Sequence, residues 1–256
     1  MKVALCLSGL IGNAEKWLQG AELDYKYGYE EYIKKTILDF GNVDVFIHSY
    51  SVEHQQGIEE LYKPVKSVFE PNLDFKLRGE ISKEQLPTPY AFCLKSMWYS
   101  RNKSVELVRE YEEENDFEYD LVLLTRFDIA IFKKFEFNKY DTSKLYIAGP
   151  IMAARMPNNQ IIPHKINDLY FMAKSKLLHK VTSVANTYEN IAVSMNPEWP
   201  MESVSSHVVI TKHLLNEGVF ENVECLFERP WQASKSWNGD LRFLRADPNA
   251  KILNKY

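Results

Sequence analysis

The sequence lacks basic runs, cysteine pairs and long apolar segments, and each absence excludes a class of protein. The net charge is −4 and the pI is near 5.9, and no run of lysine and arginine could follow nucleic-acid phosphates, so no nucleic acid is expected as a partner. The three cysteines are widely spaced in apolar stretches, which indicates a reduced, cytoplasmic protein without a structural zinc site. No segment reaches the roughly 20 apolar residues that span a bilayer, so we expect no transmembrane segment.

The glycine-rich patterns that hold phosphates are also missing. Neither GxGxxG nor GxxxxGK[ST] occurs, so the dinucleotide-binding and P-loop NTPase classes lose their main support. The first apolar run, KVALCLSG, ends in Ser8 and Gly9, whose backbone N–H groups could face an anion. A plain turn explains the same two residues equally well, so Ser8 and Gly9 are only candidate ligand-binding residues.

What is present is the composition of a folded protein, with 45% hydrophobic, 26% charged and 13% aromatic residues. The run KVALCLSG, an amphipathic stretch at 26–39 and the run VDVFIHSYS predict a strand, a helix and a strand, which is a βαβ unit with parallel strands. We therefore expect one α/β domain over 1–230, with a mostly parallel central sheet flanked by helices. Residues 231–256 are expected to form a weakly patterned coil tail that packs on this domain.

Further elements follow from the pattern of apolar residues, proline and glycine. The prediction comprises a short edge strand at 65–69, a loop and candidate lid at 71–89, a helix at 91–114, strands at 119–129, 144–150 and 169–172, a helix at 175–191, a helix from Pro200 to Gly218 and a closing strand within 219–230. The long helix is expected to bury an apolar stripe that contains Leu94, Trp98, Val105 and Val108.

Two charges stand at the end of the most apolar strand, within YDLVLLTRFDIAIFK at 119–133. Its continuous apolar run is typical of a strand covered on both faces, where Arg126 and Asp128 are costly to bury unless they pair with each other or with a ligand. Open α/β sheets bind ligands at the carboxyl ends of their strands. The two charges therefore indicate a binding site, and a structural ion pair between them is the alternative.

Other polar residues are expected at the same edge or facing it. The second strand ends with three residues that could contact a nucleotide base or ribose: His48, Ser49 and Tyr50. Lys95 and Tyr99 share one face of the long helix at a spacing that could reach a diphosphate or a sugar. A core histidine and a solvated helix face are the plain alternatives for these two groups.

Candidate acid, base and metal-binding residues lie in and after this strand. Asp168 could position a sugar hydroxyl, Glu202 could act as base, and both are candidate catalytic residues. Asp128 and His207 could hold Mg²⁺ or Mn²⁺. The motif has one aspartate fewer than the usual carboxylate pair, because Arg126 occupies the place of the first. A guanidinium can itself neutralise phosphate charge by bidentate hydrogen bonds.

The order of these segments resembles that of a family of uncharacterised glycosyltransferase-like proteins of bacteria and large DNA viruses. The resemblance covers about residues 1–230 and includes KVALCLSG, VDVFIHSYS, YDLVLLTRFDI, NDLYFMAKS and PEWPMESVSSHVVITKHLLNEG. Its most specific part is the strand ending in TRFD followed by Asn-Asp ahead of an aromatic strand. Family members usually read Ser-Gly-Gln-Pro-Arg after the first strand, whereas this chain has SGLIGNAEKW.

The resemblance implies a GT-A-like, Rossmann-like fold and transfer of a sugar from a nucleotide-diphosphate donor to a glycan, a glycoprotein or another hydroxyl acceptor. It also implies a divalent cation, Mn²⁺ or Mg²⁺, and a hexosyltransferase-like activity. Two alternatives are a module of the same fold that binds a nucleotide or glycan without turnover, and a sugar-phosphate nucleotidyltransferase. The latter normally has a glycine-rich basic loop after the first strand, where this chain has only Lys16.

Overall fold

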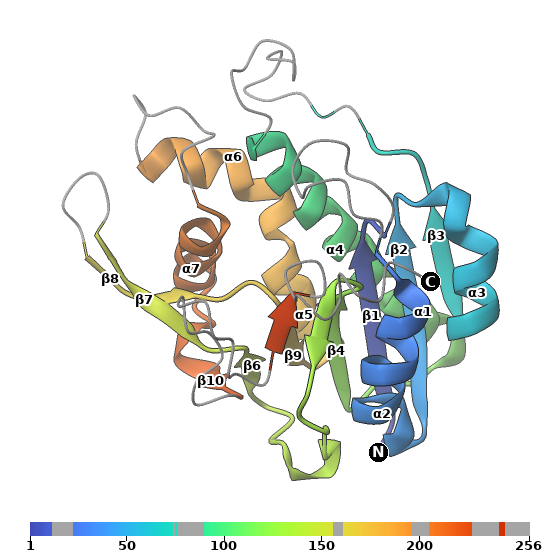
Figure 1. Cartoon of the computed structure of the whole chain (residues 1–256). Helices are drawn as coiled ribbons and strands as arrows, with labels where there is room; N and C mark the ends of the chain where they lie inside the picture. The colour runs from blue at the N-terminus through green and yellow to red at the C-terminus, as the bar shows by residue number, and fades with distance from the viewer. Residues whose placement is uncertain are drawn as a thin grey trace.

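A mixed, mostly parallel sheet forms the centre of the computed structural model, which describes residues 1–11, 23–73, 75, 90–155, 161–195, 205–226 and 241–243. The sheet has seven strands in the order β10-β6-β9-β4-β1-β2-β3 (Figure 1). Their bounds are β1 (Val3–Gly9), β2 (Val43–Ser49), β3 (Lys66–Phe69), β4 (Leu121–Arg126), β6 (Leu145–Ile147), β9 (Phe171–Ala173) and β10 (Val223–Cys225). Only β9 runs antiparallel to its neighbours in this sheet, so the predicted α/β class with a mostly parallel sheet is confirmed.

Helices cover both faces of the sheet, which explains the continuous apolar runs of the central strands. Alternate residues of β4 enter two separate cores: Val122 packs in the core that contains Trp98 of α4 (Tyr90–Asn115), and Leu123 in the core that contains Ile33. Ile33 is the last residue of a π-helical segment (Gly28–Ile33), which lies between α1 (Tyr25–Tyr27) and α2 (Lys34–Thr36). The helix predicted at 26–39 is thus present over 25–36 as one helical run with a π-helical middle, and a 3-10 turn (Leu38–Phe40) follows it.

Three further helices pack on the α4 face of the sheet. These are α5 (Ser175–Thr182), α6 (Val184–Met195) and α7 (Ser206–Asn216), and each contributes buried apolar residues to the α4 core. The helix predicted at 175–191 is two helices, because α5 ends at Thr182 and α6 begins at Val184, with Ser183 as the C-cap between them. Figure 1 shows α4, α5, α6 and α7 grouped beside the sheet, opposite α1 and α2.

Several elements were not predicted from the sequence. A short helix, α3 (Gln55–Tyr62), lies between β2 and β3. A two-stranded antiparallel pair forms between β7 (Pro150–Arg155) and β8 (Ile161–Ile166), where a loop was expected. β5 (Ile129–Ile131) pairs antiparallel with β11 (Leu241–Phe243), so the prediction of coil is wrong at 241–243. Most of the candidate lid at 71–89 lies outside the described residues.

The register of the central strands brings three of the predicted site residues to one edge of the sheet. Ser8 of β1 lies opposite both His48 of β2 and Arg126 of β4, so the three residues form one row near the carboxyl ends of parallel strands. The chain then leaves β1 at Gly9, whose φ of 105° is a conformation that favours glycine. Within the described ranges, no helix is both long enough and apolar enough to cross a bilayer.

Candidate functional site

Arg126 and Asp128 form an ion pair with two hydrogen bonds at the end of β4. The Nε–H of Arg126 donates to Oδ1 of Asp128 at 2.8 Å, and an Nη2–H donates to Oδ2 at 2.5 Å. The Asp128 side chain is only 5% exposed, whereas that of Arg126 is 24% exposed. The pairing that the sequence left as an alternative is therefore present, but β4 is a central strand and the arginine still reaches solvent.

Asp168, the predicted catalytic aspartate, lies in the connection between β8 and β9 and faces the start of α7. Its Oδ2 accepts a hydrogen bond of 2.7 Å from the Ser206 hydroxyl, and its Oδ1 lies 3.2 Å from Nδ1 of His207. Burial alone would raise the pKa of Asp168, but His207, Arg101, Ser206 and Arg126 together hold it below the usual range. Asp168 is therefore an ionised carboxylate at neutral pH.

Arg101 of α4 is a site residue that the sequence reasoning missed. Its side chain is 1% exposed, its guanidinium carbon lies 4.6 Å from the centroid of the Trp98 ring, and Nη1 lies 3.8 Å from Oδ2 of Asp168. Burial lowers the pKa of Arg101 to about 10, with Arg126 acting in the same direction and Asp168 and Asp128 opposing. Arg101 thus keeps its positive charge at neutral pH.

Among the residues that the structure describes, the terminal nitrogens of Arg101 have no hydrogen-bond partner. Neither Nη1 nor Nη2 makes a hydrogen bond in the described part of the chain. The signal for this residue was present in the sequence, because Arg101 occupies the helical position between Trp98 and Val105 in the apolar stripe of α4. A charge at a core position of an amphipathic helix is the pattern that indicates a buried functional group.

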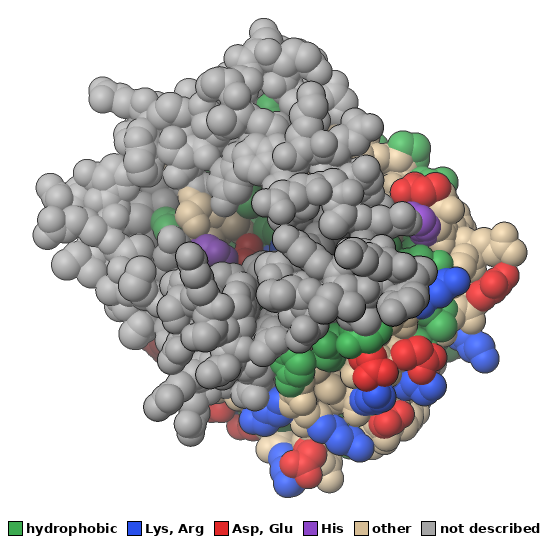
Figure 2. Space-filling model, viewed as in Figure 1, with side chains coloured by type: hydrophobic (Ala, Val, Ile, Leu, Met, Phe, Trp, Pro, Cys, Tyr) green, Lys and Arg blue, Asp and Glu red, His purple; other side chains and the backbone are tan. Residues whose placement is uncertain are grey.

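We call Arg101, Arg126, Asp128, Asp168 and His207 the charged cluster. It brings together side chains from α4, the end of β4, the β8–β9 connection and α7, and Arg101, Arg126 and both aspartates interact electrostatically. The cluster opens toward solvent through Arg126 and through His207, which is 29% exposed. On the face seen in Figure 2, a histidine and an acidic side chain are visible next to each other, where α7 approaches the sheet in Figure 1.

The predicted residues at the end of β2 belong to a separate, buried hydrogen-bond network. His48 contacts the Ser100 hydroxyl through Nδ1 at 2.8 Å and Glu70 through Nε2 at 3.0 Å, and the Gly9 N–H donates to the same Ser100 oxygen at 3.1 Å. Burial lowers the pKa of His48 even though Glu70 opposes it, so the ring is neutral. Ser49 donates to the carbonyl of Gly9 at 2.8 Å. These contacts hold the strand ends in place.

The side chains of the remaining predicted donor-binding residues contact groups outside the charged cluster. The Tyr50 hydroxyl donates to the carbonyl of Ser96 at 3.0 Å. Lys95 forms an ion pair with Glu189 of α6, and the Tyr99 ring packs edge-on against His48 with 5.8 Å between centroids. Ser8 stays close to β4, because its hydroxyl donates to the carbonyl of Thr125 at 3.3 Å. Glu202, the second predicted catalytic residue, lies outside the described residues.

The described side chains do not fit a divalent cation. Both carboxylate oxygens of Asp128 bond to Arg126, and those of Asp168 face Ser206 and His207. Among the described residues, no group of three or more His, Cys, Asp or Glu side chains could hold a metal ion. A metal held by Asp128 and His207 therefore stays a prediction from the sequence, without support from the donors in the described ranges.

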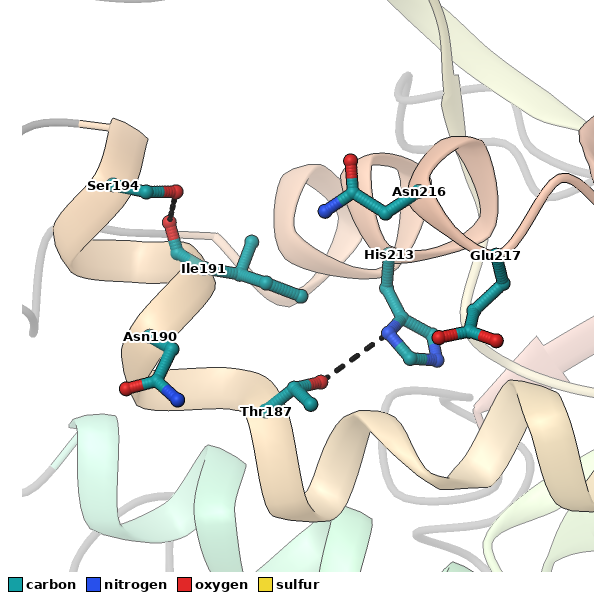
Figure 3. A pocket seen from close by; sticks show the side chains of 7 residues that line it. All are labelled: Thr187, Asn190, Ile191, Ser194, His213, Asn216 and Glu217. Carbon is teal, nitrogen blue, oxygen red and sulfur yellow. Dashed lines mark hydrogen bonds between the residues drawn. The ribbon is translucent and has the colours of Figure 1, made fainter.

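A second polar site lies between α6 and α7, as Figure 3 shows. This pocket of about 260 Å³ is lined by Thr187, Asn190, Ile191 and Ser194 from α6 and by His213, Asn216 and Glu217 from the end of α7 and just beyond it. The His213 ring is held by Thr187, 3.3 Å from Nδ1, and by the carbonyl of Lys180, 2.7 Å from Nε2. None of the predicted site residues that the structure describes lines this pocket.

Comparison with protein-family models and with curated proteins finds no match to the chain. The argument for a function therefore depends on the geometry of the charged cluster and on the resemblance described above.

Proposed function

We propose that the protein is a GT-A-type glycosyltransferase that transfers a sugar from a nucleotide-diphosphate donor to a hydroxyl of a glycan or glycoprotein acceptor. The observation that carries this proposal is the charged cluster at the carboxyl ends of the parallel strands, the edge where open α/β sheets bind ligands. The cluster combines guanidinium groups for phosphate with an ionised carboxylate for hydroxyl groups.

The reaction assigns a distinct role to each side of the cluster. The bond between the sugar C1 and the phosphate oxygen breaks, and negative charge develops on the departing nucleoside diphosphate, next to which Arg126 supplies a fixed positive charge. A new bond forms between C1 and the acceptor oxygen, and the proton of that hydroxyl passes to a carboxylate. Asp168 is ionised, and its Oδ1 lies next to the partly exposed His207, so it can accept this proton or orient a hydroxyl of the donor sugar. Glu202 remains a predicted alternative base.

A binding module without turnover is the second candidate. It is favoured by the ion pair of Arg126 and Asp128, in which both carboxylate oxygens of Asp128 already accept hydrogen bonds from Arg126. The two candidates predict the same ligand but differ in the release of nucleoside diphosphate. Binding and release therefore have to be measured separately.

A thermal-shift screen of the full chain against UDP, GDP, CDP and ADP sugars tests the proposal. One nucleotide class should raise the unfolding midpoint, because a ligand that binds only the native state stabilises it by mass action. Release of nucleoside diphosphate should follow in the presence of a glycan acceptor, and Asp168→Asn should suppress release while keeping the shift. A shift without release for any acceptor supports the binding module. No shift with any donor rejects both candidates.

A further inference from the structure

We propose that Arg101 and Arg126 jointly bind the diphosphate of the donor and take the place of a metal ion, so that donor binding needs no divalent cation. This inference rests on the proposed function and makes it more specific, because it names the groups that neutralise the diphosphate.

The first argument is the state of the Arg101 guanidinium. Buried polar groups in folded proteins are nearly always hydrogen-bonded, and an unsatisfied charged donor is among the least favourable groups to bury. Arg101 is 1% exposed, and its Nη1 and Nη2 make no hydrogen bond within the described ranges. These N–H groups need acceptor oxygens, and the planar guanidinium matches the oxygens of a phosphate in a bidentate manner.

The second argument is that Asp168 does not accept a hydrogen bond from Arg101. The closest approach of the two side chains is 3.8 Å, which is an ion-pair contact but too long for a hydrogen bond. The pair of Arg126 and Asp128 shows what full pairing looks like, with bonds of 2.8 Å and 2.5 Å. Asp168 instead accepts its hydrogen bond from Ser206. Arg101 is therefore balanced in charge but left with open donors.

The third argument is the balance of charge in the cluster. Arg101 and Arg126 face Asp128 and Asp168, so the cluster is close to neutral without a ligand. Burial depresses the pKa of Arg101 despite both aspartates, which means that a further negative charge nearby is favourable. A diphosphate supplies this charge, whereas a divalent cation would add to the positive charge of the two guanidinium groups. The oxygens of Asp128 and Asp168 are, in addition, already engaged.

The test measures binding of pyrophosphate and of UDP, GDP, CDP and ADP by calorimetry, each in EDTA and in Mn²⁺ or Mg²⁺. The first variant, Arg101→Met, removes the charge at similar size. The second, Arg101→Lys, keeps the charge but cannot form the bidentate hydrogen bonds of a guanidinium. The matched control is Arg109→Gln on the same helix, whose side chain is 40% exposed. Thermal unfolding of each variant is recorded without ligand to separate binding from folding.

We expect one nucleoside diphosphate to bind equally well in EDTA and in metal. Arg101→Met should weaken this binding by roughly tenfold to a hundredfold, the range for losing hydrogen bonds to a charged group, and Arg101→Lys by about tenfold. The unfolding midpoint of Arg101→Met should stay equal or rise, because replacing a buried charge by an apolar group of similar volume is often neutral or stabilising. If Arg101→Met does not fold, Arg101→Lys alone decides the outcome.

Two results would overturn the inference while leaving the proposed function standing: nucleotide binding that EDTA abolishes and Mn²⁺ restores, or nucleotide binding that both Arg101 variants leave within about twofold of wild type. Binding of pyrophosphate but of no nucleotide, lost in the Arg101 variants, would reject the proposed function and keep the two-arginine anion site. Absence of binding for every probe rejects both.

Discussion

Two groups of buried polar side chains lie against α4 at the same edge of the sheet, and they differ in how completely their hydrogen bonds are made. Ser100 belongs to the first group, with His48 and Glu70, and Arg101, the next residue, belongs to the charged cluster. In the first group, both ring nitrogens of His48 have partners. In the second, Arg101 has open donors within the described chain. A closed network holds a fold together, whereas open buried donors indicate a place for a ligand.

The same comparison explains why a polar residue at a strand end does not by itself identify a binding residue. His48 stands at the predicted edge, in register with Ser8, yet its contacts tie β2 to α4 and, through the shared Ser100 hydroxyl, to the Gly9 N–H at the end of β1. A neutral imidazole with Nε2–H donating to Glu70 accepts a hydrogen bond from the Ser100 hydroxyl at Nδ1, and the same Ser100 oxygen accepts from the Gly9 N–H. We therefore expect changes in this network to affect stability and not ligand affinity.

The largest effect should come from removing the charge of Asp168. Asp168→Asn leaves Arg101 buried next to a neutral group, and breaking a buried ion pair in this way lowers the free energy of unfolding by roughly 3–5 kcal/mol. Urea denaturation at neutral pH measures the loss. The double variant Asp168→Asn with Arg101→Met should recover most of it, because the uncompensated charge is then gone. An Asp168→Asn protein as stable as wild type would show that Arg101 does not depend on Asp168.

The next effect comes from opening the closed network. His48→Leu deprives the buried Ser100 and the partly exposed Glu70 of a partner, and we expect the free energy of unfolding to fall by about 1–3 kcal/mol. The affinity for pyrophosphate should stay within about twofold of wild type. His48→Gln, which keeps a donor and an acceptor, serves as the milder control in the same denaturation series. A loss of pyrophosphate affinity in His48→Leu would mean that the two groups are coupled and the comparison fails.

The parts of this architecture that the sequence predicted are those encoded by local patterns. β1, β2 and β4 are continuous apolar runs, and their register placed Ser8, His48 and Arg126 in one row. Arg101 was missed because the stripe of α4 was counted by its apolar members alone. The contacts of Asp168 with Ser206 and His207 depend on how α7 packs near the β8–β9 connection. Ser206 is 38 residues from Asp168 in the sequence. No local spacing encodes such a contact.

A moderate effect is expected on the pH dependence of stability. Burial lowers the native pKa of His48 below its ordinary value of 6.5, with Lys103 in the same direction and Glu70 opposing. The unfolded chain then binds a proton that the native state does not, so stability is full above pH 6.5 and falls as the pH drops toward the native pKa.

Each such histidine contributes a slope of up to about 1.4 kcal/mol per pH unit. His179 and His213 shift in the same direction, also chiefly through burial, so the slope should persist in part when His48 is removed. Urea denaturation of wild type and His48→Gln between pH 5 and 8 checks the difference. Equal slopes in the two proteins would show that His48 is not held neutral by its surroundings.

The smallest effect is expected for Arg109→Gln, which makes the same change in charge as a neutral Arg101 variant on the same helix. The Arg109 side chain lies 3.7 Å from Glu113, and the two side chains are 40% and 74% exposed, so their attraction is largely screened by water. We expect the free energy of unfolding to change by less than about 0.5 kcal/mol.

Pyrophosphate affinity of Arg109→Gln should equal that of wild type at roughly 0.15 M salt, where the Debye length is about 8 Å. If Arg109→Gln weakened binding as much as Arg101→Met, the anion would be sensing the overall charge of α4 and not a local site. Raising the salt concentration distinguishes the two cases, because screening removes a long-range attraction while a buried guanidinium in direct contact with phosphate keeps most of its effect.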